Sequence, residues 1–226
     1  MPLDAIIMDF NGVIVDDEFI HFKYIRDIIA EFGIELNRRL YDEKYVAMSD
    51  RDAFTAILRD HGRHPTPELV AALCERKRAR YLEEAVYEVR LFPGVREFIE
   101  GAAMAYRLAV ASGARRAEIE AILEGHGLKE AFEVIVSADE VTRGKPAPDI
   151  YRNVLHELGD VSPAQCVVIE DTPGGIQAAK AAGMTVVAVV NTMPPDALKE
   201  ADLILMDGLV NFPWVQVKLL LDEGGR

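Results

Sequence analysis

Short apolar runs rich in β-branched residues recur along the chain, and most end at a polar residue or a turn. Each run is too short for a helix and too continuous for a strand with one face in water. The pattern therefore predicts buried strands of a mostly parallel sheet. The predicted strands are Ala5–Asp9, Leu108–Ser112, Val134–Ser137, Cys166–Glu170, Thr185–Val190 and Leu203–Met206.

Segments with helical periodicity lie between these runs, at Val95–Met104, Ala117–His126, Pro148–Leu158 and Gly174–Ala182. Alternation of strands and helices is typical of an open α/β sheet with right-handed crossover connections. Such sheets bind ligands beyond the carboxyl ends of their strands. The functional residues are therefore expected at the carboxyl ends of the predicted strands.

The interval from Asp17 to about Val89 breaks this alternation. Apolar residues return there at helical spacing, and no convincing strand occurs. We interpret the interval as a helical domain inserted after the first strand, with linkers near Val15–Asp17 and Tyr87–Pro93. The predicted domains are residues 1–16 with 88–226 for the sheet, and residues 17–87 for the insertion.

Composition narrows the class of protein. The chain has 226 residues, half of them hydrophobic, which suffices for one substantial core plus an insertion. A net charge of −13 argues against a nucleic-acid or membrane-surface binder, because both need a basic face. Cys74 and Cys166 indicate no disulfide framework and fit a reducing compartment. With neither a signal-peptide pattern nor a membrane-spanning run, we expect a cytoplasmic protein, monomeric by default.

Four polar stretches mark the ends of predicted strands or the loops that follow them. Taken singly, each has an ordinary explanation as a turn-forming acid, a helix cap or a solvated lysine. Their coincidence at one edge of a sheet indicates a ligand site instead. The stretches are Asp9-Phe-Asn-Gly-Val, Ala111-Ser112-Gly113, Gly144-Lys145-Pro146 and Glu170-Asp171-Thr172.

Phosphoryl transfer is the chemistry that these residue types suit. It needs a nucleophile, a cation that offsets phosphate charge, and fixed donors for the phosphate oxygens. Asp9 is the candidate nucleophile. Its carboxylate, with Glu170, Asp171 and the backbone carbonyl of Asn11, forms an oxygen-rich candidate site for Mg²⁺.

Donors for the phosphate oxygens are predicted on the other two stretches. Ser112 and the amides of Gly113 and Ala114 precede a predicted helix, whose N-terminus favours an anion. Lys145 would supply a positive charge that holds the phosphoryl group and keeps neighbouring carboxylates ionised. The expected ligand is a small phosphorylated metabolite, and the expected cofactor is Mg²⁺.

The segments Asp9–Val13, Val110–Gly113, Gly144–Asp149 and Val168–Gly183 together resemble the motifs of the haloacid dehalogenase-like hydrolases. The likeness covers essentially the whole chain. It is closest to the branch of phosphatases and β-phosphoglucomutases that carry a helical cap after the first motif. The resemblance implies a Rossmann-like α/β core with an inserted α-helical cap, Mg²⁺ dependence and an aspartyl-phosphate intermediate.

The resemblance also implies a role for each motif residue. Asp9 would be nucleophile and metal ligand, and Ser112 and Lys145 would hold the phosphoryl group. Glu170 and Asp171 would complete the metal site.

Residues of the predicted cap are expected to determine substrate specificity. His21 and Lys77 match positions at which relatives often carry the same residues, and we expect them to contact the substrate. Mutases of this branch carry an Arg directly after the cap Ser that grips a second phosphate. Here Ser49 is followed by Asp50, with Arg51 one place further on, so hydrolysis is favoured over mutase activity.

Asn11 is the main departure from the family pattern. Phosphatases and mutases of this branch normally have a second Asp two residues after the nucleophile, which protonates the leaving group and later activates water. A carboxamide keeps the shape but cannot shuttle a proton near neutral pH. General acid–base help is worth roughly 10²–10⁴-fold, so we expect slow turnover. The sequence is compatible with a natural Asn11, which we favour, and with a substitution made to trap the enzyme.

Three functions are consistent with these residues. The favoured one is a Mg²⁺-dependent phosphatase that acts on a small phosphorylated metabolite through Asp9, slowed by Asn11. The first alternative is a sugar-phosphate mutase. The second, motivated by Asn11, is a non-catalytic binder of phosphorylated ligands.

Overall fold

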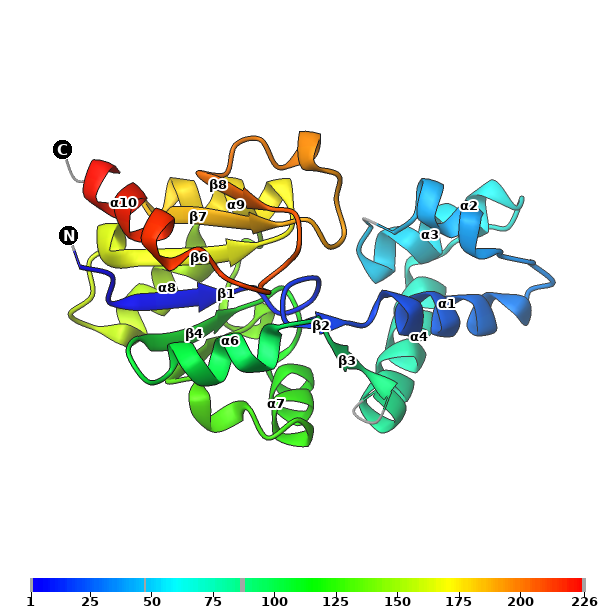
Figure 1. Ribbon diagram of the computed structural model, residues 1–226. Coiled ribbons are helices and arrows are strands. Elements are labelled where there is room, and N and C mark those ends of the chain that lie inside the picture. The colour runs from blue at the N-terminus through cyan, green and yellow to red at the C-terminus, as the bar shows by residue number, and fades with distance from the viewer. Residues whose placement is uncertain (1, 47, 86–87, 225–226) are drawn as a thin grey trace. The chain divides into compact units, whose positions relative to one another are not determined.

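The computed structural model describes residues 2–46, 48–85 and 88–224 of the chain. This part of the chain forms two compact units (Figure 1). The core unit runs to Asp16 and resumes at Arg90, and the helical unit is Asp17–Val89. The boundary predicted between residues 87 and 88 involves Tyr87, which lies outside the described residues.

A six-stranded sheet forms the centre of the core unit, with the strand order β5-β4-β1-β6-β7-β8. All neighbouring strands in it are parallel, so the predicted α/β fold with a mostly parallel sheet is confirmed. The strand β1 lies between β4 and β6, which brings the ends of three strands side by side. The strands are β1 (Ala5–Met8), β4 (Arg107–Ala111), β5 (Val134–Val136), β6 (Cys166–Glu170), β7 (Thr185–Val189) and β8 (Leu203–Leu205).

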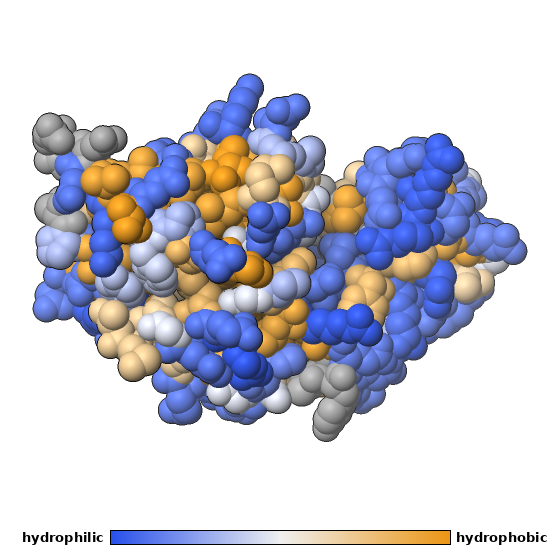
Figure 2. Space-filling model, viewed as in Figure 1, coloured by the Kyte–Doolittle hydropathy of each residue, from blue (hydrophilic) through white to orange (hydrophobic). Residues whose placement is uncertain are grey.

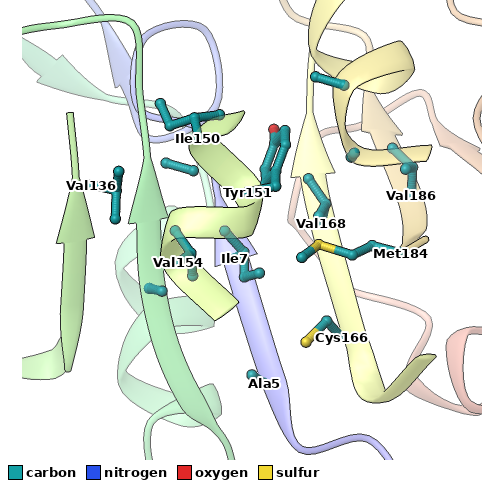
Figure 3. Close-up of a cluster of buried hydrophobic side chains, with 14 of the residues drawn as sticks. Ala5, Ile7, Val136, Ile150, Tyr151, Val154, Cys166, Val168, Met184 and Val186 are labelled. Carbon is teal, nitrogen blue, oxygen red and sulfur yellow. The ribbon is translucent and has the colours of Figure 1, made fainter. Parts of the chain in front are cut away.

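Helices cover both faces of this sheet (Figure 1). Alternate strand residues such as Ile7 and Val168 point to one face, where they pack with Tyr151 and Val154 from α8 (Figure 3). Ile176 from α9 belongs to the same cluster. The helices α6 and α10 lie on the opposite face (Figure 1). The helices of the core unit are α6 (Val95–Ala102), α7 (Arg116–Gly125), α8 (Asp149–Leu158), α9 (Pro173–Ala181) and α10 (Trp214–Gly224).

Element boundaries agree with the sequence pattern to within one or two residues. The strand β1 ends at Met8, so Asp9 lies just beyond the paired residues and not within the strand. The helix α6 ends at Ala102 and not at the predicted Met104, because a turn closed by the Ala105 N–H and the Ala102 carbonyl follows it. Such offsets are the usual fraying of element ends.

The predicted linkers contain a small antiparallel pair that the sequence did not reveal. The strand β2 (Val15–Asp16) pairs with β3 (Arg90–Leu91) where the chain leaves and re-enters the core unit. A strand of two residues is too short to show a period of two in its side chains.

The helical unit consists of α1 (Glu18–Ala30), α2 (Arg38–Lys44), α3 (Asp50–Asp60) and α4 (Pro67–Arg80), followed by a π-helical turn at Tyr81–Ala85. Side chains of Asn37, Ser49 and Thr66 accept N–H groups at the starts of α2, α3 and α4. Apolar residues from the four helices form a separate hydrophobic core, which includes Ile29, Phe54, Ile57, Leu58 and Leu73.

Hydrophilic and hydrophobic residues are both present on the surface (Figure 2). Figure 2 shows hydrophobic atoms on the core unit in the region of α10, where Val215 and Leu219 are exposed. Within the described ranges, no helix has both the length and the apolar character needed to cross a membrane.

Candidate active site

Asp9 lies at the carboxyl end of the central strand β1, where its N–H donates to the Ile169 carbonyl at 3.0 Å. A tight loop follows, in which Gly12 has a φ of +79°. A Cβ atom at Gly12 would lie 2.0 Å from Oδ2 of Asp171. Glycine is therefore needed at this position for the backbone conformation and also for the close approach of the β1 loop to Asp171.

Lys145 connects the ends of three strands. Its Nζ donates to Oδ1 of Asp9 at 2.8 Å, to the Ala111 carbonyl at 3.0 Å and to Oε1 of Glu170 at 2.6 Å. Burial by itself would lower the pKa of Lys145, but Asp9 and Glu170 raise it well above its usual value. Lys145 is therefore a fixed positive charge between two carboxylates.

Glu170 is fully buried, and both of its oxygens accept hydrogen bonds. Oε1 accepts from Lys145 and from the Tyr151 hydroxyl at 2.9 Å. Oε2 accepts from the backbone of Asp171 and from both the backbone and the hydroxyl of Thr172, at 3.0–3.1 Å. Burial would raise the pKa of Glu170, but Lys145 and these donors lower it overall, so the carboxylate is held ionised.

Asp171 is also buried, but only one of its oxygens is hydrogen-bonded. Oδ2 accepts from the Thr192 hydroxyl, whereas Oδ1 has no hydrogen-bond partner among the described residues. A buried carboxylate oxygen left without a partner is energetically costly. Desolvation, followed by the negative charges of Asp9 and Glu170, raises the pKa of Asp171 well above its usual value.

The acidic cluster fits a divalent cation. Asp9, Glu170 and Asp171 each offer a carboxylate oxygen, and these atoms lie within 4.8 Å of one another. Burial, opposed by Lys145 and reinforced by Glu170, raises the pKa of Asp9 to about 6. A hard cation would favour the ionised carboxylates and occupy the unpartnered Oδ1 of Asp171. Because both oxygens of Glu170 already accept hydrogen bonds, Asp9 and Asp171 are the stronger candidates for direct ligands.

The other predicted core residues lie on the same sheet edge. Ser112 follows β4, is buried, and accepts the Ala114 N–H at 3.0 Å. The next residue, Gly113, is exposed and has open space where a Cβ would be. Asn11 lies in the loop after Asp9 and forms an isolated bridge with Val15. The phosphate contacts of Ser112 and Gly113, and the metal contact of the Asn11 carbonyl, remain predictions.

His21 and Lys77 belong to the helical unit, where they contact each other. Lys77 is 2% exposed, and its Nζ lies 2.6 Å from Nδ1 of His21 and also bonds Asp50. An ammonium group can only donate, so Nδ1 is the acceptor and Nε2 of His21 donates to Asp17 at 2.9 Å. The two residues thus belong to one polar network, in which Lys77 is buried and His21 is partly exposed. Their contact with a substrate remains a prediction.

The sequence pattern had not singled out Tyr151, Asn191 or Thr192. Tyr151 lies on the buried face of α8, and Figure 3 shows its hydroxyl at the end of the ring that faces the carboxyl end of β6. Asn191 and Thr192 follow the end of β7. The same strand-end rule, applied to β7, would have found the latter two. Tyr151 has no such signal, because a tyrosine at helical spacing is ordinary core.

Gly175, in the first turn of α9, offers a direct test of how tightly Glu170 is packed. A Cβ there would lie 1.8 Å from Oε1 of Glu170, whereas one at Gly174 meets nothing within 4 Å. We expect Gly175→Ala to lower the free energy of unfolding by about 3 kcal/mol. The neighbouring control Gly174→Ala should instead be neutral or stabilise by up to ~1 kcal/mol. Urea unfolding measures the free-energy change for both variants. Equal changes for the two would contradict the close packing of Glu170 against Gly175.

The sequence is similar to those of known proteins. The family profile described as haloacid dehalogenase-like hydrolase matches residues 6–189. Protein CbbY from Cereibacter sphaeroides is 33% identical over 189 residues, which are 80% of this chain and 82% of that protein. Fructose-1-phosphate phosphatase YqaB from Escherichia coli (strain K12) is 32% identical over 189 residues, which are 82% of this chain and 95% of that protein.

Solved structures are similar over most of the chain. A variant of CbbY from Rhodobacter sphaeroides, in complex with xylulose-(1,5)bisphosphate, has a TM-score of 0.80 and 30% identity, covering 93% of this chain and 96% of that one. A putative β-phosphoglucomutase from Thermotoga maritima has a TM-score of 0.77 and 28% identity, covering 95% and 99%. The fold, the motif residues gathered at one sheet edge and the match over residues 6–189 lead to one conclusion: this chain belongs to the haloacid dehalogenase-like hydrolases.

Proposed function

We propose that the protein is a Mg²⁺-dependent phosphatase that hydrolyses a small phosphorylated sugar. One observation carries the proposal. Lys145 bridges Asp9 and Glu170, and Asp171, whose Oδ1 has no hydrogen-bond partner among the described residues, belongs to the same acidic cluster. This arrangement combines a buried carboxylate, a fixed cation and a carboxylate oxygen that could bind a metal ion, which are the parts that phosphoryl transfer needs.

In the proposed reaction, Asp9 attacks the phosphorus atom and forms a P–O bond as the bond to the sugar oxygen breaks, and the sugar alkoxide that leaves takes a proton from solvent water. Lys145 stabilises the transferring group, and the Ser112 hydroxyl with the Gly113 amide donates to its oxygens. Water then attacks the phosphorus on Asp9 and releases inorganic phosphate. When bound, Mg²⁺ would offset negative charge on the phosphoryl oxygens, and Asp9 and Asp171 would hold it, with the Asn11 carbonyl as a further ligand.

The substrate class follows from the relatives. Two of them are described with sugar phosphates, fructose-1-phosphate for YqaB and xylulose-(1,5)bisphosphate for CbbY. Within the proposal the helical unit acts as the cap, and His21 and Lys77 are its substrate contacts.

Asn11 makes both steps slow, since it can neither protonate the sugar oxygen nor accept a proton from water.

The test is release of inorganic phosphate from a panel of sugar phosphates and other phosphomonoesters, with Mg²⁺ and with EDTA. We expect slow, EDTA-sensitive turnover of sugar phosphates. No turnover of any panel member by this chain, and none after Asn11→Asp, would overturn the proposal. Tight ligand binding without turnover in either form would support the non-catalytic alternative.

A sugar-phosphate mutase is the second candidate, favoured by the similarity to the putative β-phosphoglucomutase. The contacts of Ser49 and Asp50 weigh against it. The Ser49 hydroxyl caps α3 by accepting the Asp52 N–H and donates to the Asp52 carboxylate at 2.6 Å, and Asp50 bonds Lys77. These groups are already paired within the helical unit. Interconversion of hexose phosphates without release of phosphate would establish the mutase.

A further inference from the structure

The loop that follows β7 forms hydrogen bonds to two segments of the candidate active site. The Thr192 hydroxyl donates to Oδ2 of Asp171, and Nδ2 of Asn191 donates to the Gly12 carbonyl at 2.7 Å. The first contact reaches the end of β6, and the second reaches the loop after β1. Neither Asn191 nor Thr192 belongs to the motifs that define the family resemblance.

We propose that Thr192 is a positioning residue, which orients the Asp171 carboxylate so that Oδ1 is the oxygen presented to a divalent cation. The proposal rests on the proposed function only in requiring that Mg²⁺ binds at this cluster. It specifies which of the two carboxylate oxygens of Asp171 would bind the metal ion.

The contacts around Asp171 explain why this selection needs a hydroxyl. With its bond from Thr192, Oδ2 has a partner, whereas Oδ1 has none among the described residues. The Gly12 backbone adjoins Oδ2 so closely that a Cβ there would lie 2.0 Å away. Without the hydroxyl, both oxygens would be unsatisfied, and the carboxylate would lose the bond that sets its rotation. Partners of this kind, one step removed from a metal, typically change its affinity by 10–100-fold.

Asn191 keeps the loop in place for this task. Its bond to the Gly12 carbonyl holds the start of the loop against the β1 loop, one residue before Thr192. The Thr192 residue as a whole is exposed, so its side chain contributes little to the hydrophobic core. A substitution at Thr192 can therefore remove the hydroxyl without unfolding the protein.

Isothermal titration of the metal-free protein with MgCl₂ tests the proposal. We expect Thr192→Val, which keeps the shape but removes the hydroxyl, to raise the Kd for Mg²⁺ by 10–100-fold. Thr192→Ser restores the hydroxyl and should bind within about threefold of wild type. The matched control Thr55→Val removes a hydroxyl bonded to the Arg51 carbonyl in the helical unit and should leave the Kd unchanged.

The melting temperature in EDTA shows whether each variant is folded, and it should stay close to that of wild type. If Thr192→Val does not fold, Thr192→Ala makes the same comparison. Equal Mg²⁺ affinity in wild type and in the folded variant without the hydroxyl would overturn the positioning role and leave the proposed function intact. If wild type itself binds no Mg²⁺, the metal-dependent function fails, and the positioning role fails with it.

Discussion

Asp9→Asn should abolish phosphatase turnover, with a fall in kcat on the order of 10⁴-fold or more. The amide oxygen is a poor nucleophile, and no other described carboxylate both accepts Lys145 and is left free to attack. The oxygens of Glu170 are occupied by Lys145, Tyr151 and Thr172, and Asp171 is bonded to Thr192. The covalent step would therefore be lost. Phosphate release under saturating sugar phosphate and Mg²⁺ measures the fall in kcat.

Two comparisons separate the loss of the nucleophile from a loss of structure. The control Asp160→Asn makes the same chemical change at a side chain that is 95% exposed, and it should leave turnover unchanged. Intact-protein mass spectrometry of the acid-quenched reaction should show one added phosphoryl group on wild type and none on Asp9→Asn. Turnover by Asp9→Asn within tenfold of wild type would show that another group is the nucleophile.

Asn11→Asp should raise kcat by roughly 10²–10⁴-fold on a sugar phosphate. The new carboxyl group would donate a proton to the leaving alkoxide and then accept one from the attacking water. Asn11 is half-buried in the loop two residues after Asp9, and Asp has nearly the same shape. Steady-state assays of a sugar phosphate and an aryl phosphate measure the gain.

The size of the gain should depend on the leaving group. The aryloxide of an aryl phosphate leaves without needing a proton, so the first step should gain little with this substrate, and only the hydrolysis of the phosphorylated Asp9 should become faster. The matched control Asn211→Asp, at an exposed residue of the core unit, should leave both rates unchanged. An equal gain for sugar and aryl substrates would show that Asn11 limits only the second step. No gain for either would contradict its assignment as the missing proton carrier.

The strand pattern predicted the sheet well because buried parallel strands are continuous apolar runs, and their ends are abrupt. The predicted run from Ala5 agrees with β1 to one residue, and the run from Cys166 agrees with β6. By contrast, β2 and β3 were missed. Their pairing joins residues some 75 positions apart in the chain, and only tertiary contact makes two-residue strands visible.

The residues of the candidate active site also divide into those that the sequence predicts and those that only the structure shows. Asp9, Lys145, Glu170 and Asp171 were identified from chemistry at strand ends, and the structure places their side chains together. Tyr151 was missed because its hydroxyl contacts Glu170 from a helix whose spacing indicates only core. No sequence pattern shows whether such a hydroxyl meets a carboxylate.

The linear order of apolar and polar residues by itself determined the α/β class, the helical insertion pattern and the chemical types available at the strand ends, because these follow from local periodicity and side-chain chemistry. The tertiary structure alone decided which carboxylate oxygens of the site accept hydrogen bonds. It pairs both oxygens of Glu170 and one of Asp171, and leaves Oδ1 of Asp171 without a partner among the described residues. Hydrogen bonds between distant segments depend on the distances and angles that packing sets, and these have no signature in the order of residues.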